Sequence, residues 1–133
     1  MQHDTFIGQL QDRGQLDSRG AAESAARAAL ETLAERLPPD LAEDLAAQLP
    51  VEIGEHLRRV TTDPTADHAA RFGRGEFVTR LSERAYTDEP TAAHLARVVF
   101  ELLDEATTGG IMTKVRASLP EDLREFSRAG SSG

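Results

Sequence analysis

The stretch Thr91–Ala106, TAAHLARVVFELLDEA, is the most apolar continuous run in the chain, and it decides the fold. Its apolar residues recur at steps of three and four, which is the periodicity of an α-helix, and further apolar residues stand on the remaining sides. They are Leu95, Val98, Val99, Phe100, Leu102, Leu103 and Ala106. At ~1.5 Å per residue, this helix is about as long as a small domain is wide. We therefore expect it to lie at the centre of an all-α bundle.

The length and composition of the chain fit one cytoplasmic domain. It has 133 residues, a common size for a single domain, and no cysteine, which excludes disulfides and thiolate metal sites. The N-terminus lacks the basic start and apolar run of a secretory signal, and no segment approaches the roughly eighteen apolar residues of a membrane span. We expect a cytoplasmic protein that does not enter a membrane.

The chain is acidic, and its charge is unevenly distributed. It carries 15 basic and 23 acidic residues, a net charge of −8, which disfavours binding to nucleic acids and anionic membranes. Residues 1–70 have 6 basic and 13 acidic side chains, whereas residues 71–133 have 9 and 10. The nearly neutral second half therefore leaves room for a local basic patch.

Glycine and proline residues divide the rest of the chain into short helices. A first helix is expected over about residues 4–13, ended by Gly14. A second begins at the N-cap Asp17 and presents a face rich in alanine, onto which another helix can pack closely. Proline then opens two further helices, at Pro39 and Pro50, because it is tolerated in the first turn of a helix.

The same pattern begins again at Phe72, so we interpret the chain as two tandem copies of a four-helix unit. Equivalent residues stand 71 positions apart at first, and 70 apart from Tyr86, which falls on Leu16. The clearest match pairs Leu49-Pro50 with Leu119-Pro120. We predict eight short helices in one bundle-like domain. Its parts are the first copy at about 4–60, a linker at about 61–71, the second copy at about 72–128 and a disordered tail at 129–133.

The duplication makes the alanine-rich second helix the counterpart of Thr91–Ala106. It also makes Thr87 the counterpart of the cap Asp17. Small side chains in one long helix correspond to large ones in the other, so we expect these two helices to lie against each other.

This duplicated pattern resembles the family catalogued as domain of unknown function 2267 (DUF2267). The resemblance covers nearly the whole chain. Its strongest segments are ETLAERLPPDLAEDLAAQLPVEI, residues 31–53, and RVVFELLDEATTGGIMTKVRASLPEDL, residues 97–123. It implies an all-helical tandem repeat in a small cytosolic protein, with no established activity, cofactor or catalytic residues. One departure is His56, which falls on Phe126 of the second copy.

Acidic ladders on the two long helices are the first candidate site. Residues four apart share a helix face, so each ladder places two carboxylates one turn apart. Such carboxylates can hold a metal ion or do acid–base chemistry, and four of them converge if the helices cross. The structural alternative is a solvated rim of ion pairs. The ladders are Arg27, Glu31 and Glu35 and, 70 positions later, Arg97, Glu101 and Glu105.

Basic and bulky residues of the second half are candidates for partner binding. The arginines Arg71, Arg74, Arg80 and Arg84 form the one basic concentration, and Arg80 and Arg84 share a helix face. They can meet an acidic partner, including the acidic first half of another copy, or simply solvate a helix. The bulky candidates for a groove between the copies are Phe100, Met112 and Phe126. The alternative is that these three side chains form part of the core.

The histidines and a glycine pair are weaker signals. His3, His56, His68 and His94 lack ligand spacing to one another, so we expect no metal site. We place His3 and His68 in flexible segments and expect His94 to be a half-buried packing residue. Gly109-Gly110 precedes a helix, but no strand and no Gly-x-x-x-x-Gly-Lys accompany it, so a turn is expected rather than a phosphate loop.

These patterns favour a non-enzymatic helical module, without a cofactor, that binds another protein or itself. The alternative is a metal-dependent or small-molecule-binding activity that uses Glu31, Glu35, Glu101 and Glu105. A third hypothesis is a DNA-binding regulator, since short helices joined by tight turns have helix-turn-helix spacing. The acidic charge and the single lysine, Lys114, disfavour that third hypothesis.

Overall fold

The computed structural model describes residues 1–66 and 71–131, and this part of the chain consists of α-helices without strands. The predicted all-α class and the eight predicted helices are confirmed within it. The helices are α1 (His3–Arg13), α2 (Arg19–Arg36), α3 (Pro39–Ala47), α4 (Val51–Thr61), α5 (Arg74–Ala85), α6 (Glu89–Ala106), α7 (Ile111–Ser118) and α8 (Glu121–Ser131). None of them is long and apolar enough to cross a membrane.

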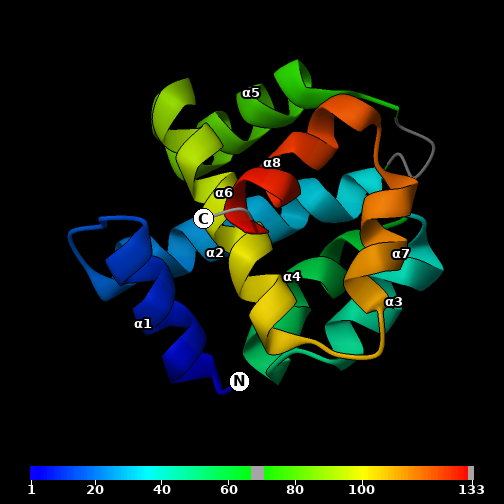
Figure 1. The fold of residues 1–133 in the computed structure, drawn as a ribbon, viewed down its shortest axis with the longest axis horizontal. Helices are drawn as coiled ribbons and strands as arrows, with labels where there is room; N and C mark the ends of the chain where they lie inside the picture. Colours follow the sequence, from blue (N-terminus) through cyan, green and yellow to red (C-terminus); the bar gives the residue numbers. More distant parts are fainter. Residues whose placement is uncertain (67–70, 132–133) are drawn as a thin grey trace.

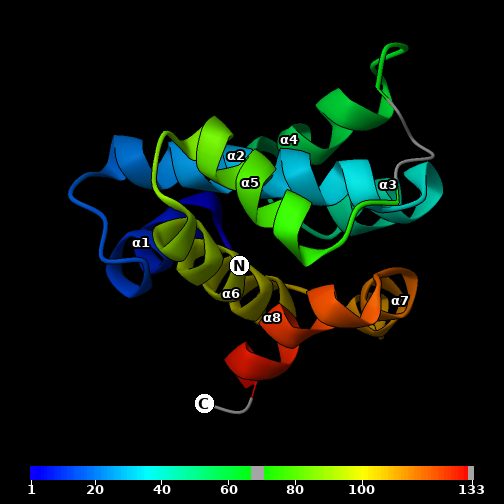
Figure 2. The same cartoon turned by 90° about the horizontal axis from the view of Figure 1, so that it is seen from above.

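The helices pack into one bundle around the two long helices (Figure 1). Seen from above in Figure 2, α2, α3, α4 and α5 lie on one side, and α6, α7 and α8 lie on the other. Helix α1 packs against both α2 and α6. The bundle is therefore closed by contacts between segments far apart in the sequence.

Helix α6 has the central place that the sequence predicts. It contacts α1, α2, α5 and α8, and Leu102 and Leu103 are completely buried. Its contact with α2 is also as predicted, since Ala29 and Leu33 of α2 line the same small apolar space as Val99 of α6. However, α2 packs more extensively on α1, α4 and α5 than on α6. The alanine-rich helix is therefore enclosed by several neighbours, and its contact with α6 is one of its smaller ones.

Several helix contacts recur in matching pairs along the chain, although the extensive packing of α3 on α4 has no match of that extent between α7 and α8 among the described residues. Helix α1 packs on α2 as α5 packs on α6, and α2 packs on α4 as α6 packs on α8. The contact of α2 with α5 has its match in the contact of α6 with α1. These pairs are what two four-helix copies related by a pseudo-twofold axis would make, while the duplication itself stays a prediction from the sequence.

Both long helices begin one residue later than predicted. The N-cap of α2 is Ser18, whose hydroxyl accepts a hydrogen bond from the amide of Ala21 at 3.0 Å. The N-cap of α6 is Asp88, whose carboxylate accepts from the amide of Thr91 at 2.8 Å. The predictions of Asp17 and Thr87 were wrong because a capping residue followed each of them directly. A cap accepts from the amide two or three residues ahead, and the later residue meets that condition.

The turns before the two long helices each contain a residue with a left-handed backbone. Gly14 has ordinary right-handed angles, and the left-handed residues are Gln15 and Tyr86, both with φ 54°. Gly14 is needed instead for space, since a Cβ there would lie 2.6 Å from the carbonyl oxygen of Leu10. Tyr86 thus shares its backbone conformation with Gln15, while its equivalence with Leu16 stays a prediction from the sequence.

The linker, the glycine turn and the C-terminal tail agree in part with the boundaries predicted from the sequence. No helix lies between Thr61 and Arg74 in the described residues, and 67–70 of the expected linker fall outside them. Gly109 and Gly110 form the expected turn, with φ 72° and 77°. The expected disordered tail begins at 129, whereas α8 continues through Ser131; residues 132–133 lie outside the described part.

Candidate functional site

The first acidic ladder is held by arginines from a neighbouring helix. Arg84 of α5 donates from its two terminal nitrogens to the two carboxylate oxygens of Glu35 on α2, at 2.8 and 2.7 Å. Arg80 adds a bond to Glu35 at 3.2 Å. Burial raises the pKa of Glu35, but the hydrogen bonds from Arg84 and Arg80 outweigh it, so this pKa lies below its usual value. Glu35 is therefore a firmly ionised carboxylate and a poor proton acceptor.

The second acidic ladder is held in the same way from α1. Arg13 donates to the two carboxylate oxygens of Glu105 at 2.6 and 2.9 Å, and it also binds Glu101. The hydrogen bond from Arg13 lowers the pKa of Glu105, and the pKa of Arg13 is raised in return. We call these two groups, Arg84 with Glu35 and Arg13 with Glu105, the α5–α2 clamp and the α1–α6 clamp. Each clamp joins helices from different halves of the chain.

The clamps favour the interpretation of the acidic ladders as ion pairs. The four glutamates do not converge but lie in two separate pairs, each facing guanidinium groups whose charge opposes a metal cation. Among the described residues, no group of three potential ligands is placed to hold a metal. The ladders do form ion pairs, although the partners Arg27 and Arg97 expected within each ladder are replaced by arginines of other helices.

Arginines of the predicted basic cluster also form contacts within the molecule. Arg80 and Arg84 both bind Glu35, and the guanidinium of Arg80 stacks 4.0 Å from the ring centre of Phe72. Arg74 forms an ion pair with Glu125 at 3.5 Å. Arg80 and Arg84, proposed from sequence as partner-binding residues, therefore hold α5 against α2.

The three bulky candidates for partner binding belong to the core. Phe100, Met112 and Phe126 are 2, 4 and 0 % exposed. Phe126 packs 6.0 Å from the ring centre of Phe77, and Arg74 covers its face at 4.5 Å. Side chains this deeply buried offer no surface to a partner, so the alternative of a core role applies to all three.

The histidines differ in part from expectation. His94 is exposed rather than half-buried, and its Nε2 lies 2.9 Å from the carbonyl oxygen of Arg13. His3 belongs to α1, whereas it was expected in a flexible segment, and His68 lies outside the described residues. His56 is half-buried on α4, and the guanidinium of Arg59 lies 2.5 Å from its Nδ1.

His56 should make stability depend on pH. Burial, followed by the charges of Arg59, Arg27 and His3, lowers its pKa to about 4. Between that value and its unfolded pKa of about 6.5, the unfolded chain binds the proton and the folded chain does not, so folding is less favourable as pH falls. We expect His56→Phe to flatten the stability curve between about pH 6.5 and pH 4, measured by urea unfolding. An NMR titration giving His56 an ordinary pKa would contradict this expectation.

A groove lies on the surface between α5, α6 and α8. Val78, Pro90 and Ala93 form its apolar wall, and its volume is about 550 Å³. Its other lining residues are Gly75, Arg74, Glu89 and Asp122. Tyr86, in the turn that joins α5 to α6, is 90 % exposed. We call this surface, with Tyr86, the α5–α6 groove.

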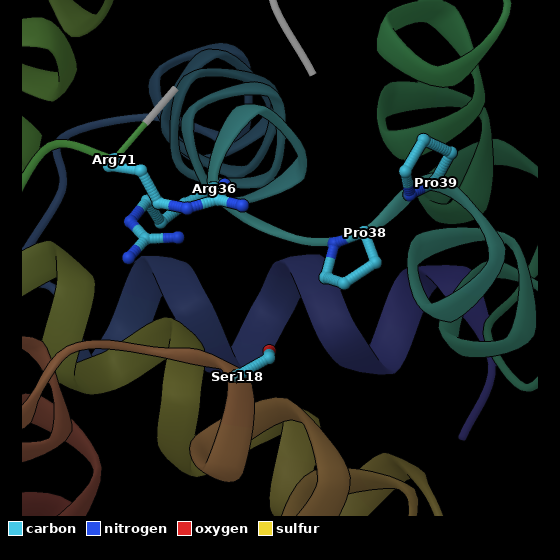
Figure 3. A pocket seen from close by; sticks show the side chains of 5 residues that line it. All are labelled: Arg36, Pro38, Pro39, Arg71 and Ser118. Carbon is cyan, nitrogen blue, oxygen red and sulfur yellow. The ribbon is translucent and has the colours of Figure 1, made fainter. Parts of the chain in front are cut away.

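A second cavity, of about 330 Å³, lies where the end of α2 meets α7 (Figure 3). It is lined by Arg36, Pro38, Pro39, Arg71 and Ser118, and we call it the arginine pocket. Arg36 is only 9 % exposed, and its Nε donates to the carbonyl oxygen of Phe72 at 2.8 Å. Two guanidinium groups thus line one small cavity.

Sequence reasoning missed the arginine pocket, although one signal of it was present. Arg36 follows Leu33 by three residues, so the apolar periodicity of α2 continues onto an arginine. A charged residue at a core position of a helix indicates a buried charge that needs a partner. What the sequence does not reveal is that Arg71, which is 35 residues away, lines the same cavity.

Comparison with known proteins gives a family but no activity. A family model described as "Uncharacterized conserved protein (DUF2267)" matches residues 3–126, which is most of the chain. No curated protein matches the sequence.

Proposed function

Because the chain belongs to the DUF2267 family of uncharacterised conserved proteins, we propose from its geometry that it is a non-catalytic module that binds another protein. The α5–α6 groove is the proposed contact surface. The observation that carries the proposal is the combination of an apolar groove between α5 and α6 with an exposed tyrosine in the turn that joins these two helices.

The composition of the groove supports a protein partner. The apolar wall of Val78, Pro90 and Ala93 is bordered by the charged residues Arg74 and Glu89. An apolar centre with a polar rim is the usual composition of a protein interface. A segment of a partner can therefore bury apolar side chains on the wall and pair its polar groups with the rim.

The conformation of Tyr86 supports the same surface. A left-handed backbone costs a residue other than glycine roughly 1 to 2 kcal/mol. With 90 % of its surface exposed, Tyr86 gains little packing within the chain to offset this cost. Tyrosine is enriched among the residues that dominate binding energy, because its ring offers a large contact area and its hydroxyl a hydrogen bond.

The arginine clamps favour binding over catalysis. Their carboxylates are ionised and hydrogen-bonded, which makes Glu35 and Glu105 unsuited to accept or donate a proton near neutral pH. The alternative activities that require the acidic ladders would first have to break these ion pairs.

The test is a comparison of groove variants with a matched control. Tyr86→Ser removes the exposed ring, and Ala93→Gln fills the groove without a change of charge. Val51→Ser is the control, because Val51 is the exposed large hydrophobic residue of α4, 68 % exposed and outside the groove. The wild type and each variant serve as baits in cells of the source, and a captured protein is then purified and titrated directly.

We expect the purified partner to bind the wild type and Val51→Ser equally, and both groove variants at least about tenfold more weakly, a change of about 1.4 kcal/mol. Light scattering at increasing concentration identifies the case in which the partner is a second copy. Equal binding by all four proteins, or no partner for the wild type, would overturn the proposal.

A further inference from the structure

The charges that border the α5–α6 groove do not balance. Its cation, Arg74, forms an ion pair with Glu125 at 3.5 Å and covers the ring of Phe126 at 4.5 Å. Glu89 forms no ion pair within the described residues, and its carboxylate accepts a hydrogen bond from the hydroxyl of Thr79 at 3.0 Å. The positive charge of the groove is therefore neutralised inside the chain, while the charge of Glu89 is available to a cation from outside.

Asp122 adds a second negative charge to the groove. Its carboxylate lies at the N-terminus of α5, where it accepts from the backbone amide of Arg74 at 3.0 Å. It forms no ion pair among the residues that the structure describes, although its charge favours the protonated form of Arg36. The turn that carries Tyr86 also ends in an acidic residue, the exposed N-cap Asp88. The groove and the turn beside it therefore have an excess of negative charge.

The first half of the chain offers an internal comparison. At the predicted offset of 70 residues, Glu89 falls on Arg19 and Ala93 falls on Glu23. In the first half, Arg19 lies 3.5 Å from Glu23 and 2.5 Å from Asp4, so the corresponding surface is closed by its own ion pairs. In the second half, a glutamate and an alanine take the places of this arginine and its partner. The unpaired carboxylate beside an apolar wall is thus particular to the α5–α6 groove.

We propose that the α5–α6 groove binds a basic segment of another protein, in which an arginine or lysine stands next to apolar side chains. The inference rests on the proposed function and specifies the chemistry of its partner. The apolar side chains of the segment cover Val78, Pro90 and Ala93. Its cation pairs with Glu89, and the exposed ring of Tyr86 offers a face on which a guanidinium can stack.

A second copy of the chain fits this surface poorly. Each copy has a net charge of −8, so two copies repel each other as they approach. Like charges placed opposite each other across an interface also disfavour the wrong partner. A basic segment meets the acidic rim with the opposite sign, which gives it the complementary charge that self-association lacks.

The experiment selects peptides on the whole chain and compares variants of matched charge. Short random peptides displayed on phage are selected on the immobilised wild type in about 0.15 M sodium chloride, which screens attraction between distant exposed charges. The enriched peptides are then synthesised and titrated into each protein. Glu89→Lys reverses the charge at the groove, and Glu55→Lys makes the same change at an exposed position of α4. Because these two variants have equal net charge, a difference between them belongs to the groove.

We expect the enriched peptides to combine arginine or lysine with apolar residues. They should bind the wild type and Glu55→Lys within about twofold of each other, and Glu89→Lys at least about tenfold more weakly, since reversal places like charges opposite each other. Glu89→Gln removes the charge but keeps an acceptor for the hydroxyl of Thr79, and its binding should be about threefold weaker than that of the wild type. If the lysine variant fails to fold in a thermal melt, the glutamine variant carries the test.

Two kinds of failure are distinguishable. Enriched peptides that are acidic or uncharged, or that bind Glu89→Lys as tightly as Glu55→Lys, would overturn the inference of a basic partner. The proposed function survives that result if Tyr86→Ser and Ala93→Gln still weaken binding. Peptides unaffected by every groove variant, or no enrichment at all, would overturn both the basic partner and the groove as a contact surface.

Discussion

Replacing Leu102 with alanine is expected to lower the free energy of unfolding by about 2 to 5 kcal/mol, which is the range for truncating a buried leucine. Leu102 is completely buried on α6, and α6 contacts helices from both halves of the chain. The cavity left by the substitution therefore lies where the two halves meet. Since a whole domain is stable by only 5 to 15 kcal/mol, we expect the melting temperature to fall by roughly 10 °C.

The matched control for this variant is Leu41→Ala on α3. Leu41 is partly exposed and packs at the edge of the core, so its truncation should cost less than half as much. Thermal melts followed by circular dichroism measure both variants. A fall of less than about 2 °C for Leu102→Ala would contradict the central place of α6.

Replacing Arg84 with methionine is expected to have the second-largest effect, a loss of about 1 to 3 kcal/mol. The substitution removes two hydrogen bonds to Glu35 and one to the buried hydroxyl of Thr32, which lies 2.8 Å from the same guanidinium. The side chain of Glu35 is only 18 % exposed, so water replaces these bonds poorly. The same substitution at Arg13 should cost under about 1 kcal/mol, since Glu105 is 44 % exposed.

Urea unfolding of both variants measures the difference between the clamps. An equal loss for Arg84→Met and Arg13→Met would contradict the proposed role of burial in the α5–α2 clamp.

The pH dependence of stability gives a further check on this clamp, because the folded pKa of Glu35 lies below its unfolded value. The clamp then stabilises fully above about pH 4.5 and loses this effect as pH falls through the folded pKa. Glu35→Gln should therefore show a shallower loss of stability in acid.

Local sequence patterns predicted the helices well and the side-chain partners poorly. The periodicity of Thr91–Ala106 identified α6, and proline and glycine marked the joints, because both signals act within a few residues. The caps were missed by one residue, since Asp17 and Ser18 have similar preferences and only the geometry of the first turn distinguishes them. Phe100, Met112 and Phe126 were open to two interpretations, because an apolar residue suits both a core and an interface.

The candidate site could be predicted only in part. The sequence identified Glu35 and Arg84 as unusual residues, but it could not show that one binds the other across 49 positions. It placed Arg27, which lies four residues from Glu31 on the same helix, in the ladder with Glu31 and Glu35 instead. Arginine side chains are long, so a partner on a neighbouring helix competes with one on the same face.

The sequence by itself determined that this chain is all-helical, where most helices begin and end, and that α6 is buried, because these properties depend on residues close together in the chain. Only the tertiary structure decided which arginine neutralises which glutamate, that Tyr86 is exposed, and that Arg36 and Arg71 line one cavity. Charges and cavities depend on distances between helices, and those distances are set by the packing of the whole bundle.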